Sequence, residues 1–162
     1  MLKKLGGYAL GAAFFVALFA IPLLFIKGAM WASEHLLEPL IRIGWWVLAV
    51  TVVVALPLAI FKRMRAAVAI AIMYSSFIYG LIAWLTGFVI TYTYWGVFGV
   101  VFGLFFAGVG VVPFGLLASA FHGWDGFVPL LVLVFLTFGS RIVAFTLAAS
   151  ADKYYAARAF AG

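Results

Sequence analysis

Charged residues are scarce in this chain, and their scarcity indicates its class. Lys, Arg, Asp and Glu together make up 9% of the residues, whereas soluble domains carry about 25%. Hydrophobic residues make up 69%. A soluble fold of 162 residues could not cover so much apolar surface with so few polar groups. We therefore predict an all-α integral membrane protein that forms a single polytopic domain over residues 1–162.

Cysteine is absent, and histidine occurs only at His35 and His122. The absence of cysteine excludes disulfides, thiolate metal ligands and thiol nucleophiles. Metal and haem sites generally need more ligands than one histidine and a carboxylate, so we expect no metal and no cofactor. The net charge of +6 comes from basic residues that flank apolar runs. This placement predicts contact with the headgroups of a lipid bilayer and no nucleic-acid partner.

The longest uncharged stretch, residues 66–121, is the main guide to topology. It holds about 56 residues, whereas one membrane-spanning helix needs about 20. The chain must fold back within it, and the sequence TYTYWG at 91–96 offers interfacial aromatic rings and the flexible Gly96. The apolar runs predict a bundle of five transmembrane helices with a short interfacial helix after the first span. The expected spans are 5–26, 39–61, 66–90, 97–121 and 127–149.

Two basic clusters suggest an orientation. Lys3 and Lys4 precede the first expected span, and Lys62, Arg63 and Arg65 follow the second. The positive-inside rule places both clusters in the cytoplasm of a bacterial inner-membrane protein, with the N-terminus inside and the C-terminus outside. The remaining basic residues fall on the other side in this arrangement. Dual insertion, with antiparallel dimers, therefore stays open as an alternative.

Arg141 is the principal candidate functional residue, because it lies inside the fifth apolar run. Ionisable groups within a span usually mark a pathway or a specific partner. Glu38 is the predicted partner, with Glu34 as second choice, and such a pair would tie the first loop to the fifth span. The alternative is that Arg141 extends its side chain to the headgroups at the nearer end of the span.

Two further patterns occur in the third and fourth expected spans. Three hydroxyl side chains share one helical face of the third span, where they could line a polar path or form hydrogen bonds between helices: Ser75, Tyr79 and Thr86. Three glycines share one face of the fourth span and predict close helix packing: Gly99, Gly103 and Gly110.

Two polar clusters suggest chemistry less strongly. The first is a possible entry site for a cation or metal, although Glu38 could equally pair with Arg42 in a solvated loop: Glu34, His35, Glu38 and Arg42. The second has the residue types of a hydrolytic triad: Ser119, His122 and Asp125. A triad is recognised by its geometry, and the adjacent glycines predict a turn with no device to stabilise an oxyanion. We expect no enzymatic activity.

Two classes of function fit these features. The first is a non-enzymatic accessory or assembly subunit, recruited to other membrane subunits through its faces of small residues. The second is a homo-oligomeric channel or transporter, in which Arg141 and the Ser/Tyr/Thr face form a path for an anion or small solute. Five spans are few for a monomeric transporter, so the second function requires an oligomer.

Overall fold

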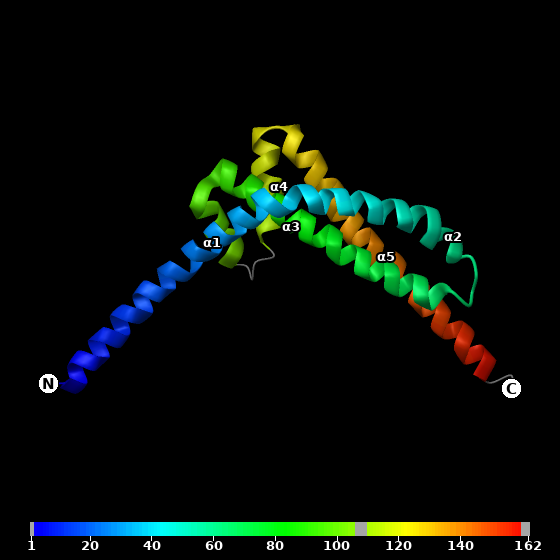
Figure 1. The fold of residues 1–162 in the computed structure, drawn as a ribbon, viewed down its shortest axis with the longest axis horizontal. Coiled ribbons are helices and arrows are strands. Elements are labelled where there is room, and N and C mark those ends of the chain that lie inside the picture. Colours follow the sequence, from blue (N-terminus) through cyan, green and yellow to red (C-terminus); the bar gives the residue numbers. More distant parts are fainter. Residues whose placement is uncertain (1, 106–109, 160–162) are drawn as a thin grey trace.

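The computed structural model describes residues 2–105 and 110–159, and this part of the chain is helical apart from short turns. Figure 1 shows the succession of helices along the chain. Their bounds are α1 Leu2–Val50, the π-helix η1 Thr51–Ala55, α2 Leu56–Leu58, α3 Arg65–Phe105, α4 Val111–His122 and α5 Trp124–Ala159. The predicted all-helical class is confirmed for the described residues.

Among the described residues, three helical stretches are long and apolar enough to cross a membrane: Leu23–Leu58, Arg65–Phe105 and Trp124–Ala156. Five spans are not confirmed. In the most apolar part of each stretch, 11% of the first stretch and 17% of the third are buried inside the chain, whereas 44% of the second is buried. The α3 helix is therefore the centre of the fold, and most residues of the other two stretches are not buried within the described part of the chain.

The α1 helix runs without interruption through the region where we expected a separate interfacial helix. That expectation rested on Pro39, which removes one backbone donor and crowds the preceding turn. In the structure the helix continues through Pro39, and Figure 1 shows a change of direction between its blue and cyan parts. Proline therefore interrupts one hydrogen bond of α1 without ending the helix.

The fourth expected span, 97–121, is not one straight helix. Gly96 breaks α3 with φ 64° and ψ −156°, and Figure 1 shows the green end of α3 turning back there. A Cβ atom at Gly103 would lie 3.1 Å from the Cα atom of Val111, whereas eight residues of continuous helix span about 12 Å. The segments on either side of residues 106–109, which lie outside the described residues, thus form a helical hairpin. The α4 helix has 12 residues, or about 18 Å, which is too short to cross a ~30 Å hydrocarbon layer.

The α3 and α5 helices run antiparallel over most of their length. Contacts join Gly80 to Thr137 near their middle, and Arg65 Nη1 to Ser150 Oγ at 3.5 Å near one end. At this same end, the Tyr155 hydroxyl donates to the Arg63 carbonyl at 3.2 Å. The C-terminal part of α5 therefore lies beside the basic loop at 62–65. This neighbourhood differs from the five-span arrangement, which placed the loop and the C-terminus on opposite sides.

Candidate functional site

Arg141 lies at the contact between α5 and α3. Its Nε atom donates to Ser76 Oγ at 3.5 Å, and its guanidinium carbon lies 5.4 Å from the centre of the Phe77 ring. The Ser76 side chain is fully buried and donates in turn to the Met73 carbonyl at 2.7 Å. Arg141 itself is half-buried. The guanidinium thus has one hydroxyl and one aromatic face as neighbours, and an arginine stays charged in both environments.

The position of Arg141 along α5 places it well inside the apolar stretch. Asp125 is sixteen residues before it and Asp152 eleven residues after it, or about 24 Å and 16 Å along the helix axis. We expected a span ending at residue 149, which would have put Arg141 closer to the headgroups. The α5 helix instead continues past this position to Ala159.

The predicted pairing of Arg141 with Glu38 or Glu34 is not formed. Glu38 Oε1 instead accepts from Arg42 Nη2 at 3.3 Å, and both side chains are largely exposed. Glu34 is also exposed. The physical reason is the placement of α1, which packs against α3 and, within the described residues, does not contact α5. The first loop therefore cannot be tied to the fifth span through these groups.

The three hydroxyl residues of the expected polar path lie along one face of α3, and this face packs against α1. Ser75 donates to the Ala71 carbonyl at 2.9 Å and lies 3.5 Å from Thr51 Oγ1 at the start of the π-helix. The Tyr79 hydroxyl is buried and approaches Thr51 without completing a hydrogen bond of normal geometry. The Thr86 hydroxyl is buried and has no hydrogen-bond partner within the part of the chain that the structure describes. Arg141 approaches α3 from α5, so these hydroxyls and Arg141 occupy different helix interfaces.

The three glycines of the expected packing face have different surroundings. Gly103 lies against the backbone of Val111, whereas a Cβ atom at Gly99 would meet Trp95 of its own helix. Gly110 is buried and immediately precedes α4. The closest approach between helices involves a pair that we did not predict. A Cβ atom at Gly115 of α4 would lie 2.9 Å from the Cα atom of Gly87 in α3.

Two of the three residues that suggested a hydrolytic triad, Ser119 and His122, have other partners. Ser119 Oγ donates to the Gly115 carbonyl at 2.8 Å within its own helix. The His122 ring stacks on Tyr94 at 4.4 Å between centroids, and its Nδ1 atom lies 2.9 Å from the Ala118 carbonyl oxygen. Similarly, His35 stacks on Trp31 and bonds to its carbonyl oxygen. These contacts hold each ring against its own or a neighbouring helix, and they do not assemble a nucleophile with a base.

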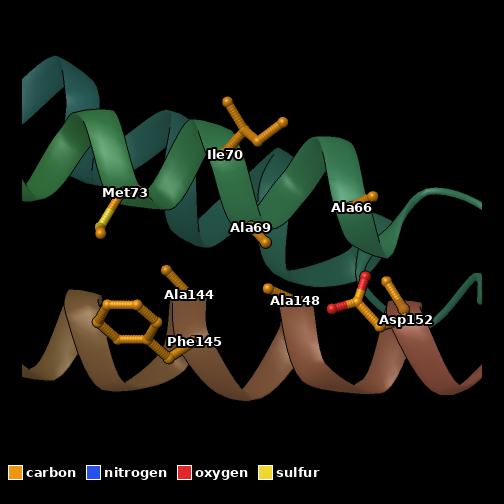
Figure 2. A pocket seen from close by; sticks show the side chains of 9 residues that line it. Ala66, Ala69, Ile70, Met73, Ala144, Phe145, Ala148 and Asp152 are labelled. Atoms are coloured by element: carbon orange, nitrogen blue, oxygen red, sulfur yellow. The ribbon is translucent and has the colours of Figure 1, made fainter.

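An open groove between α3 and α5 is the feature that our sequence interpretation missed. Its volume is about 310 Å³, and Figure 2 shows its lining side chains, with Asp152 at one end and Phe145 towards the other. Most of its lining is apolar, and alanines predominate: Ala66, Ala69, Ala144, Ala148 and Ala151. The signal in the sequence is the spacing of the α5 alanines by four and three residues, which puts them on one helix face.

No family model matches the chain, and no match was found among the curated proteins or the solved structures.

Proposed function

We propose that this protein is a non-enzymatic accessory or assembly subunit of a bacterial inner-membrane complex. One observation carries the proposal: Arg141 lies within an apolar span and has no carboxylate partner among the described residues. An arginine inside a membrane is costly unless a partner compensates it. In an accessory subunit, another protein of the complex would supply that partner when the complex assembles.

The lightly buried surfaces of α1 and α5 support the same proposal. Many large apolar side chains of these helices are exposed, including Trp45, Trp46, Phe135 and Phe138. Lipid can cover such residues, and so can the helices of other subunits. Surface of this kind is available to a partner without any rearrangement of the α3–α5 core.

A homo-oligomeric channel or transporter for an anion or small solute is the second candidate. It is favoured by the hydroxyls of Tyr79 and Thr86, which are buried without complete hydrogen bonding. However, these hydroxyls lie on the α1 side of α3, and Arg141 lies on the α5 side. A path that used both would require α3 to rotate or a second copy to contribute, which is why we rank this function lower.

For the topology, we infer that the end of the molecule that carries Lys62, Arg63, Arg65 and Lys153 faces the cytoplasm. The α3 and α5 helices and the C-terminal part of α1 would then cross the membrane. The hairpin formed by the segments on either side of residues 106–109 would enter and leave the membrane from the opposite side. The N-terminal part of α1, with Lys3 and Lys4, would add a further crossing that starts in the cytoplasm. In Figure 1 the N-terminal end of α1 and the C-terminal end of α5 both point away from the turn between α4 and α5.

Measurement of the intact assembly tests the function. The tagged chain is purified from its native membranes in mild detergent, and the mass of the complex is determined. We expect a heteromeric complex with defined stoichiometry. A symmetric assembly that contains only copies of this 17.6-kDa chain would contradict the accessory role and favour the channel.

A further inference from the structure

The groove between α3 and α5 leads from the basic end of the molecule towards Arg141. Phe145, Ala148 and Asp152 line the groove from α5, and Arg141 is one helical turn before Phe145 on the same face. On α3, Met73 lines the groove and Phe77 follows it by one turn. The Arg141 guanidinium lies over the Phe77 ring, so these two side chains lie together about one helical turn beyond the lining of the groove.

The groove is shaped for the close approach of a helix. Ala69, Ala144 and Ala151 are buried between α3 and α5, whereas Ala66 and Ala148 are half-buried and leave room at its surface. Small residues at such positions let two helix backbones pack tightly in a membrane. Two of its lining side chains, Ile70 and Phe145, are exposed, so the groove reaches the surface of the chain. A partner helix could therefore lie along it with its own side chains inserted between those of α3 and α5.

The charge of Arg141 specifies the chemistry of the occupant. The chain has four acidic residues, and none of them lies near this guanidinium. Asp152 and Asp125 are about 16 Å and 24 Å away along α5, and both glutamates belong to α1, which in the described residues does not contact α5. Arginine binds a carboxylate through two parallel hydrogen bonds, and inside a membrane such pairing compensates the cost of both charges.

A second copy of the chain does not meet this requirement. The α1 and α5 helices both run antiparallel to α3, and their contacts with α3 define relative depths. Gly44 of α1 lies level with Ile82, and Arg141 of α5 lies level with Ser76. Glu38 comes six residues before Gly44 and so lies level with residue 88 of α3, about twelve residues, or roughly 18 Å, from the level of Arg141. In a copy inserted with the same orientation, no acidic side chain lies at the depth of Arg141.

We propose that the α3–α5 groove binds a transmembrane helix of a different protein, and that this helix carries an aspartate or glutamate at the depth of Arg141. The inference rests on the proposed accessory function and names the chemistry of the partner. The carboxylate would receive two hydrogen bonds from the guanidinium. The small residues of the groove would hold the helix backbone close enough for that contact.

A synthetic helix of leucine and alanine provides a defined probe. One version carries a single aspartate about eleven residues from its basic-side end, and a second version carries asparagine at that position. The purified full chain is labelled at Lys62→Cys, which is possible because it has no cysteine of its own, and both partners are placed in phosphatidylcholine vesicles. Energy transfer between a dye on this cysteine and a dye on the peptide measures binding. We expect the aspartate peptide to bind at least about tenfold more tightly than the asparagine peptide.

Three matched variants test the geometry. Arg141→Met should abolish the preference for aspartate, whereas Arg141→Lys keeps the charge and should retain part of it. Ala148→Phe fills the groove and should weaken binding of both peptides. Ala149→Phe adds the same bulk at an exposed position of the same helix, outside the groove lining, and should leave binding unchanged. A peptide with its aspartate moved by two turns should bind no better than the asparagine peptide.

Equal binding of the two peptides, or a preference that survives Arg141→Met, would overturn the proposal. Energy transfer between two labelled copies of the chain without peptide, if it is lost in Ala148→Phe, would also overturn it by making a second copy the occupant. Failure of the peptide test while the chain still purifies in a heteromeric complex would reject the groove and leave the accessory role intact. A chain that assembles only with itself would reject the accessory role.

Discussion

A Cβ atom at Gly115 would lie 2.8 Å from the carbonyl oxygen of Gly87. Real Cβ atoms do not approach a backbone so closely, so this contact between α4 and α3 requires glycine at position 115. It anchors α4 against α3, just before α3 turns at Gly96. The short α4 helix, which cannot cross the membrane alone, is thereby held inside the fold.

Gly115→Ala should therefore destabilise the protein. The added methyl group meets backbone atoms that cannot rotate away, and overpacking of this kind costs about 1–3 kcal/mol. Gly139→Ala is the matched control, because its Cβ atom would meet nothing within 4 Å. The control should be neutral or, through its helix propensity, stabilising by up to about 1 kcal/mol. Unfolding in detergent measures both variants, and equal stability of the two would disprove the close approach.

A hydrogen bond between helices reinforces the same region. The buried Thr91 hydroxyl lies 2.7 Å from the Gly87 carbonyl oxygen and 3.2 Å from the Val111 carbonyl oxygen. Thr91→Val keeps the shape and removes the donor, so we expect a loss of about 0.6–1.7 kcal/mol in the free energy of unfolding. Thr93→Val alters an exposed threonine nearby and should have little effect. If both variants unfold alike, the Thr91 contact contributes nothing to stability.

Cysteine labelling distinguishes the topology that we propose from the five-span arrangement. Tyr94 stacks on His122, so we expect Thr93→Cys and Asp125→Cys to be labelled from the same side of the membrane. Lys62→Cys and Lys153→Cys should both be labelled from the opposite side, because Tyr155 bonds to Arg63. Five straight spans would instead place Thr93 and Asp125 on opposite sides. Labelling of every site from both sides would indicate dual insertion.

Arg141 and Glu38 should act independently. Because Glu38 pairs with the exposed Arg42 and α1 does not reach α5 in the described residues, Arg141→Met and Glu38→Gln share no contact. Their effects on the free energy of unfolding should add within about 0.3–0.5 kcal/mol. A double-mutant cycle in detergent measures the coupling. A double variant more stable than either single variant would restore the pair that we first predicted.

Several features could be predicted from residue types alone. The scarcity of charge indicated apolar helices, and the break at Gly96 was expected because its aromatic neighbours and its flexible backbone favour a turn at the interface. Arg141 stood out because a charge inside an apolar run is rare. Each of these signals is local, and none depends on which helices become neighbours.

The arrangement of the helices could not be predicted in the same way. When a helix is apolar on all sides, periodicity does not reveal which face is buried, so the spacing of the α5 alanines could not by itself show that they line a groove against α3. Residues 97–121 are apolar enough for a straight span, and composition does not distinguish such a span from a hairpin. The seventeen glycines of the chain also offer many possible pairs, and the Gly87–Gly115 contact depends on a crossing that only the fold defines.

The most direct test of the accessory role compares the intact assemblies of the wild-type chain and the Arg141→Met variant. Both are purified from native membranes in mild detergent and weighed, with Arg42→Met as the control because Arg42 is an exposed arginine. We predict that the wild type and the control have masses that include a second, different protein, and that Arg141→Met loses it. Masses equal to whole multiples of 17.6 kDa for all three chains would contradict the account.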